Sequence, residues 1–429
     1  MRESRQHFLG VLTVLLFLVV LVSGYVLVRQ NTTVTEAYMI TNVPQAVFYV
    51  EQFNVQQKRY KIHCIYEKDL DQLNEKEIKN RYPSIIFGSR ILSKKVLSLL
   101  DDISYLFSTL SINRRSFYEG LLDAGYYKNR QLLLPVSFNI PAAITLKAPN
   151  SEDAAGSVLQ YSAMRSAGNE YTVNEKNTYV TMGFHPVWSD AALYGLLKAF
   201  DVSFSEEKSI TWDRTRLDEA SRYIKLWYSD ASVSMKDTVN FNEQYRQIPP
   251  DLRVNLKKTQ AWVFSSLDFF ALDDSRRSGL QFAWMARDSV IPADDDAVFL
   301  GILSNGRAKD AGDAFIKWFF RYDTQSRLLE QSKLFRLDEI CFGIAGGFSA
   351  LSDVTEKLYP LYYRELLGKA PPRNMVILEG VRPSSWDDAK TGILLPILRE
   401  WLTSDASFDL NDRLASELSA WHKRQSAGP

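Results

Sequence analysis

Cysteine and histidine are scarce in this chain of 429 residues, which contains two cysteines and four histidines. Cys64 and Cys341 are far apart in the sequence, and no two histidines have the spacing of metal ligands. This scarcity argues against a disulfide framework and against a zinc cluster, so we expect no metal and no cofactor. Both cysteines lie in apolar stretches, where a free thiol packs well, and we predict that they are unpaired and buried.

An excess of charge of either sign is also absent, because 51 Lys and Arg residues balance 51 Asp and Glu residues. Without a broad basic surface, a nucleic acid is not expected as the main partner. Hydrophobic residues make up 46% of the chain and charged residues 24%, which is ordinary for folded domains with a sizeable core. The length predicts two or three domains.

The common catalytic signatures are missing as well. The chain has no GxSxG nucleophile elbow, no HExxH zinc motif and no GxxxxGK[ST] phosphate loop. The glycines between residues 343 and 347 are not followed by Lys-Ser or Lys-Thr, so we interpret them as a flexible joint. We therefore expect no catalytic residue and no enzyme activity.

Two groups of aspartates are the densest carboxylates in the chain, one at residues 294–296 and one at Asp387 and Asp388. Paired carboxylates can act as the acid and base of a glycosidase, which keeps an exported enzyme open as an alternative. Their spacing does not match a calcium-binding EF-hand. The simpler interpretation is a solvated turn for the first group and a helix N-terminus for the second, where acids complement the helix dipole.

Residues 8–28 form a run of apolar and small residues without a charge, long enough to cross roughly 30 Å of hydrocarbon as a helix. Arg2 and Arg5 precede the run and predict a cytoplasmic N-terminus. Tyr25 stands where a lipoprotein signal would carry its lipid-bearing cysteine. We expect an uncleaved transmembrane signal anchor in the cell membrane, with the globular part outside the cytoplasm; a cleaved signal peptide is the alternative.

Strands and helices are expected to alternate in the first part of the exported chain, as strands at 36–41, 60–66 and 82–88 and helices at 44–57 and 74–80. This order predicts parallel βαβ units with right-handed crossovers.

Further helices are expected at 91–110, 155–164, 189–200, 216–229, 310–330, 396–403 and 411–424, and further strands at 260–267, 279–287 and 297–304. Three segments are interpreted as connectors between two lobes, namely 135–141, 297–304 and 340–347.

Four stretches occur in the order found in the extracellular solute-binding proteins of ABC importers, in the group that includes sugar and oligosaccharide binders. Residues 82–87 (YPSIIF) resemble that family's third strand, with Ser84 in place of the usual Asp. Residues 133–138 (LLPVSF) resemble its crossover into the second lobe, and the strands predicted between 261 and 303 resemble its return. Residues 311–331 (AGDAFIKWFFRYDTQSRLLEQ) resemble the helical segment that follows.

The resemblance implies an α/β, two-lobed periplasmic-binding-protein fold with three hinge crossovers, preceded by the transmembrane helix. Lobe one would comprise residues 36–138 and 305–344, and lobe two residues 139–301 and 346–421. The implied function is capture of a small solute, in particular a sugar or oligosaccharide, between the lobes and its delivery to the permease of an ABC importer. Besides the exported glycosidase or esterase, a sensor or structural protein that has lost small-ligand binding stays open.

Ligand contacts are expected where the strands end at the cleft. In lobe one, the candidates are Asn42, Gly88, Ser89 and Arg90, which follow predicted strand ends. In lobe two, they are Trp188, Ser266, Asp268 and Trp386. The two tryptophans lie in loops among polar residues, where an indole could offer a flat apolar face to a sugar ring; the alternative is that both cover the edge of a core.

Overall fold

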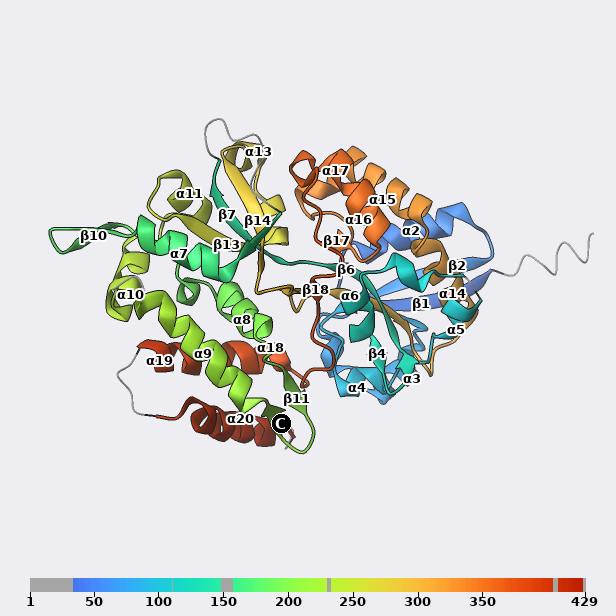
Figure 1. Ribbon diagram of the computed structural model, residues 1–429. Coiled ribbons are helices and arrows are strands. Elements are labelled where there is room, and N and C mark those ends of the chain that lie inside the picture. The colour runs from blue at the N-terminus through green and yellow to red at the C-terminus, as the bar shows by residue number, and fades with distance from the viewer. Residues whose placement is uncertain (1–33, 110, 148–156, 230–232, 404–407, 427–429) are drawn as a thin grey trace, which may run out of the picture.

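The computed structural model describes residues 34–109, 111–147, 157–229, 233–403 and 408–426. The apolar run at 8–28, predicted to cross the membrane, lies outside these residues. Among the helices that are described, none is both long and apolar enough to cross a membrane. The described chain has the predicted α/β architecture and folds into two lobes connected by extended segments (Figure 1).

The first lobe is built on a six-stranded sheet in the order β17-β6-β16-β3-β1-β2. Strands β1 (Thr35–Thr41), β2 (Tyr60–Tyr66) and β3 (Ile85–Ser89) pair in parallel, as the βαβ pattern predicts. Helices α2 (Ala46–Gln56) and α3 (Glu75–Arg81) make the two crossovers. Because parallel strands end at the same edge of a sheet, the loops after β1 and β3 lie close together.

Three antiparallel strands complete this sheet, β6 (Leu133–Phe138), β16 (Val298–Ile302) and β17 (Phe348–Ser349). Strand β16 lies between β3 and β6, and all of its residues are buried. Residues 298–301 were expected in lobe two, but their backbone pairing with β3 and β6 puts them in the sheet of lobe one.

The second lobe has a four-stranded sheet in the order β13-β7-β14-β8. These strands span Ala261–Ser265 (β13), Pro141–Leu146 (β7), Leu280–Ala286 (β14) and Val158–Gln160 (β8).

Helix α8 (Asp190–Ala199) packs on β7 and β13 in this lobe, and it also contacts α9 (Arg214–Ser229). Helices α19 (Leu395–Thr403) and α20 (Leu410–Ser426) lie against α9, so the C-terminal end of the chain belongs to the second lobe (Figure 1).

The chain crosses between the lobes three times. The first crossing, at 139–140, directly follows β6, as predicted. The second lies at 293–297, just before β16, and not within 297–304. The third passes through β18 (Val376–Ile377), which pairs in parallel with β15 (Ile291–Pro292) beside the second crossing. The crossing expected at 340–347 is therefore made about thirty residues later.

The glycine-rich segment 343–347 forms a hydrogen-bonded turn within the first lobe, and not the flexible joint that we expected. Ile344 and Gly347 exchange backbone hydrogen bonds of 3.1 and 3.0 Å. The hydroxyl of Tyr359 donates to the carbonyl of Gly347 at 2.6 Å and accepts from the amide of Ile344 at 2.9 Å. Gly343 has a φ of +59°, which a residue with a side chain rarely adopts.

Two long helices expected from the sequence are interrupted. The segment 310–330 forms α14 (Lys309–Phe319) and α15 (Tyr322–Leu334), and Phe319 and Phe320 are buried where the helix is interrupted. In the described part of the segment 91–110, residues 91–109, the α-helices are the single turns α4 (Lys94–Leu97) and α5 (Tyr105–Ser108).

The two cysteines, Cys64 and Cys341, are unpaired, as predicted. Each is half-buried, however, and not fully buried.

The aspartates at 294–296 do not form the solvated turn that we expected, because they lie on the second crossing between the lobes. The carboxylate of Asp295 is surrounded by three cations, Lys198 Nζ at 3.1 Å, Lys390 Nζ at 2.9 Å and Arg382 Nη1 at 3.3 Å. All four side chains are between 7% and 14% exposed.

Burial alone would raise the pKa of Asp295, but the charges of Arg382, Lys198 and Lys390 hold it well below its usual range. The ion cluster thus joins α8 and the second crossing to residues 382–390, which follow the third crossing.

Replacing Asp295 by Asn should lower the free energy of unfolding by about 3 to 5 kcal/mol, because three buried cations lose their counter-charge. The pKa of Asp295 is depressed in the folded state, so this stabilisation is present above the unfolded-state pKa of about 3.9 and declines as the pH falls below it. Urea unfolding of the full-length protein at several pH values measures both effects.

The matched control for this change is Asp288→Asn, since Asp288 is 80% exposed and lies 3.9 Å from Arg287. This variant should stay within about 0.5 kcal/mol of the parent protein. If the Asp295→Asn variant were equally stable, the ion cluster would not hold the crossings together.

Replacing Gly343 by Ala should cost about 2 to 4 kcal/mol of stability, through the positive φ and a steric clash. A Cβ at this position would lie 2.4 Å from the carbonyl oxygen of Gly347 and 2.6 Å from the hydroxyl of Tyr359. Gly392 is the control, because a Cβ there meets no atom within 4 Å, and Gly392→Ala should be neutral or slightly stabilising. Thermal unfolding of both variants compares them; an unchanged midpoint for Gly343→Ala would favour a flexible joint.

Candidate ligand-binding cleft

Asn42, which follows β1, fixes the loop that follows β3. Its side-chain nitrogen donates to the carbonyl of Ser89 at 3.1 Å, and its oxygen accepts from the amide of Ser89 at 3.0 Å. A Cβ on the neighbouring Gly88 would lie 2.2 Å from Leu70 and 2.7 Å from the Asn42 oxygen, so only glycine fits there. The hydrogen bonds between Asn42 and Ser89 fix the turn in which Arg90, with a φ of +60°, projects from the end of the sheet.

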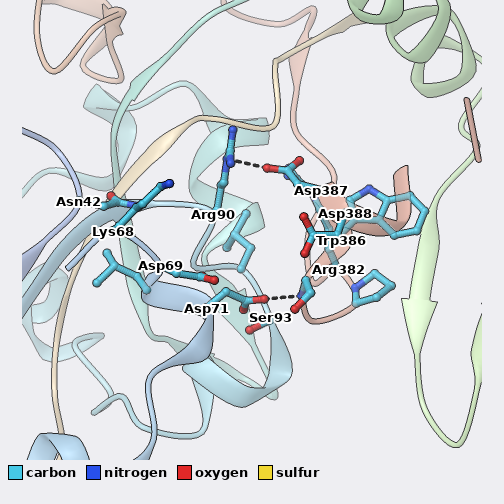
Figure 2. A pocket seen from close by; sticks show the side chains of 14 residues that line it. Asn42, Lys68, Asp69, Asp71, Arg90, Ser93, Arg382, Trp386, Asp387 and Asp388 are labelled. Carbon is cyan, nitrogen blue, oxygen red and sulfur yellow. Dashed lines mark hydrogen bonds and ion pairs between the residues drawn. The ribbon is translucent and has the colours of Figure 1, made fainter. Parts of the chain in front are cut away.

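A cavity of about 380 Å³ lies between these loops and the segment that leads into α18 (Trp386–Ala389). Its first wall comes from the loops after β1, β2 and β3 and includes Asn42, Lys68, Asp69, Asp71 and Arg90. Its second wall comes from the chain after the third crossing and includes Arg382, Ser385, Trp386, Asp387 and Asp388 (Figure 2). Residues from both halves of the molecule therefore face the same space.

Polar contacts connect the two walls. The Arg90 guanidinium approaches the carboxylate of Asp387 to 2.6 Å between Nε and Oδ2 (Figure 2). Gln72 donates to the hydroxyl of Ser385 at 2.6 Å, and the backbone amide of Ser385 donates to Asp71. Burial raises the pKa of Asp71, and the hydrogen bonds that it accepts lower it. These contacts hold the walls together at one side of the cleft.

A second cavity of about 250 Å³ lies on the other side of the Arg90–Asp387 ion pair, since both residues line both cavities. It is lined by α8, by the beginning of α12 (Ser266–Phe270) and by the second crossing. Its polar lining residues are Tyr194, Lys198, Ser265, Asp268, Asp294, Asp295, Asp296 and Lys390.

The carboxylates of this second cavity are unequal in their surroundings. Asp295 has three cations beside it, whereas the carboxylate of Asp294 accepts from the hydroxyl of Ser265 at 2.5 Å. Burial, together with the charges of Asp294 and Asp295, raises the pKa of Asp296 to about 7. Burial also raises the pKa of Asp294 and of Asp268. This cavity therefore holds acidic groups that resist ionisation.

The two tryptophans predicted as ligand contacts lie in different surroundings. Trp386 lines the first cavity, with its indole nitrogen donating to the hydroxyl of Tyr194 at 3.0 Å and its ring stacked on Phe204 at 4.5 Å. Trp188 lines neither cavity. Its ring stacks between Phe241 and Trp262 in the second lobe, at 5.9 and 5.8 Å.

Of the other residues predicted as ligand contacts, some line the two cavities and others lie outside both linings. Asn42 and Arg90 line the first cavity, and Arg90 and Asp268 line the second. Gly88 and Ser89 support the loop that carries Arg90. Ser266 is buried at the first crossing, where its hydroxyl donates to the side chain of Asn139 at 2.8 Å.

Several lining residues were not anticipated from the sequence, among them Lys68, Asp71, Lys198, Arg382 and Lys390. The burial of Lys198 could have been predicted, because it is a cation near the end of an otherwise apolar stretch (AALYGLLKAF). A lysine is almost never buried unless it is paired, so this position pointed to a buried carboxylate elsewhere in the chain.

No protein-family model and no curated protein matches this chain. Solved structures of sugar-binding proteins do match. A binding protein for cyclic α-maltosyl-1,6-maltose from Arthrobacter globiformis has a TM-score of 0.63 at 15% identity, covering 91% of this chain and 100% of that protein.

The sugar-binding protein MalE from Xanthomonas citri has a TM-score of 0.64 at 9% identity, covering 92% of this chain and 100% of that protein. The galacto-N-biose/lacto-N-biose I-binding protein of an ABC transporter from Bifidobacterium longum has a TM-score of 0.55 at 12% identity. The match covers 91% of this chain and 96% of that protein. Nearly the full length of each chain is shared. The protein thus has the two-lobed fold of sugar-binding proteins of ABC transporters.

Proposed function

We propose that this protein is an extracytoplasmic solute-binding protein that captures a small carbohydrate between its lobes and delivers it to an ABC importer. The observation that carries the proposal is the first cavity, whose walls come from the strand ends of one lobe and from the chain that enters α18 in the other. A ligand bound there contacts both lobes, so it can shift the balance between open and closed arrangements.

The lining of the cleft suits a polyhydroxylated ligand. Carboxylate, guanidinium and amide groups line it and can each form hydrogen bonds with sugar hydroxyls, while Trp386 and Leu92 add apolar surface. The three similar proteins described above are binding proteins for sugars, which supports the same class of ligand here.

We assign the ligand contacts to residues that line the cavities, Asn42, Arg90, Asp268 and Trp386 among those predicted, together with Lys68 and Asp71. Trp188 is assigned a structural role, because aromatic rings cover it in the second lobe. Gly88, Ser89 and Ser266 position the walls and the first crossing.

Anchoring by residues 8–28 and docking to an importer permease belong to the same proposal. An anchor would keep the binding lobes close to the membrane face of their transporter. The alternatives are an exported glycosidase or esterase and a sensor that has lost small-ligand binding. Two observations weigh against an enzyme. Asp387 and Asp295 both form ion pairs with cations, and the similar proteins are binding proteins.

Arg90→Ala should weaken carbohydrate binding at least about tenfold, equivalent to about 1.4 kcal/mol, because Arg90 lines both cavities and holds the opposite wall. The side chain is 63% exposed, so the variant should fold normally. A panel of neutral and amino-substituted mono- and oligosaccharides is first screened by thermal shift with the full-length protein, because a ligand that binds the native state raises the melting midpoint. The affinity of the best ligand is then measured by calorimetry.

Arg114→Ala is the matched control for this test. Arg114 is in the same lobe, 48% exposed, and pairs with Asp123 at 3.0 Å away from both cavities. It should leave the affinity unchanged. If no saccharide binds the parent protein, the proposed function is wrong; turnover of chromogenic glycosides or esters would support the enzyme instead.

The mature protein should retain residues 8–28, because neither a cleavage site nor a lipid-bearing cysteine is evident in the sequence. N-terminal sequencing of the protein extracted from membranes tests this expectation. A mature chain that starts after Ser23 would rule out the anchor and would indicate a cleaved signal peptide.

A further inference from the structure

Three carboxylates that line the second cavity are not part of an ion pair within the described chain. Among the residues that the structure describes, Asp268, Asp294 and Asp296 form no ion pair, whereas every cation of the cavity has a carboxylate already. Lys198 pairs with Asp295, Lys390 pairs with both Asp295 and Asp387, and Arg90 pairs with Asp387.

Asp296 is the least satisfied of the three carboxylates. Its Oδ1 atom is inaccessible to solvent and has no hydrogen-bond partner among the described residues. A buried carboxylate without a partner is costly, and it normally either takes up a proton or acquires a cation. The raised pKa of Asp296, caused first by burial and then by Asp294 and Asp295, indicates that protonation is what compensates it when the cavity is empty.

A metal ion does not fit this arrangement. No group of three or more His, Cys, Asp or Glu residues in the described part of the chain has a geometry that could hold a metal. The cavity, at about 250 Å³, is also far larger than a single ion requires. An organic cation, which combines hydrogen-bond donors with bulk, matches a cavity of this size lined by carboxylates better.

We propose that the second cavity binds the ammonium group of an aminated carbohydrate, so that the solute is an amino sugar or a short oligosaccharide containing one. This inference rests on the proposed function and specifies its ligand. An ammonium group has three donors, and the lining of this cavity offers the carboxylates of Asp268, Asp294 and Asp296 as acceptors. The rest of the ligand occupies the first cavity, on the other side of the Arg90–Asp387 pair.

A linked release of protons follows from this mode of binding. When a cation enters, the ionised form of Asp296 is favoured, and the proton that this carboxylate holds leaves. The charged and titratable groups that face Asp296 are Asp294 and Asp295 on its own segment, Lys198 on α8 and Arg90 on the loop after β3. Lys198 and Arg90 already have carboxylate partners, so they do not satisfy Asp296.

The test compares three disaccharides with the same β-1,4 skeleton by calorimetry of the full-length protein at pH 6.5. They are the glucosamine disaccharide, its N-acetylated form, in which the nitrogen is uncharged, and cellobiose. The glucosamine disaccharide should bind at least tenfold more tightly than both others. Titrations in two buffers with different heats of ionisation should show proton release for this ligand alone.

D296N should weaken binding of the glucosamine disaccharide at least tenfold and so remove its preference over cellobiose. D288N, an exposed change in the same lobe, should alter neither. Should D296N fail to fold, the preference among ligands and the proton release in the parent protein still decide the question. Equal or tighter binding of the neutral disaccharides, without proton release, overturns this inference and leaves the proposed function standing. Binding of no saccharide overturns both.

Discussion

The carboxylate of Asp295 determines how the parts of this molecule are held together. It lies on the second crossing between the lobes, and its three cations come from α8, from Arg382 just after the third crossing and from Lys390 beyond α18. A buried ion cluster adds little net stability compared with apolar packing, but it requires specific partners at specific places. It therefore fixes where the third crossing meets the second lobe, and with it the position of the cleft wall formed by residues 382–388.

The same segment illustrates how the cleft combines rigid and adjustable contacts. Arg382 donates its backbone amide to Leu92 at 2.8 Å, and its side chain is buried beside Asp295. Five residues further on, Asp387 meets Arg90 at a partly exposed ion pair. The wall is thus held by a buried contact at Arg382. At Asp387 it is held by a solvent-exposed ion pair, which costs little free energy to break.

The parts of the fold that could be predicted are those that depend on residues close together in the sequence. The strands β1, β2 and β3 follow from short apolar runs between predicted helices, and the crossing at 139–140 follows from the prolines around it. The burial of Asp295 could not be predicted in this way, because its partners Lys198 and Arg382 are 97 and 87 residues distant in the sequence. The surroundings of Trp188 could not be predicted for the same reason, since its neighbours in the sequence are polar but its neighbours in space are aromatic.

The Arg90–Asp387 pair lies between the two cavities, and its side chains are 63% and 26% exposed. The attraction between exposed charges decreases as the salt concentration rises, with a screening length of about 8 Å at physiological ionic strength. The partition between the cavities is therefore weaker in a concentrated medium than in a dilute one. Ionic strength consequently acts on the shape of the cleft, because loss of this pair would remove the partition between the two cavities.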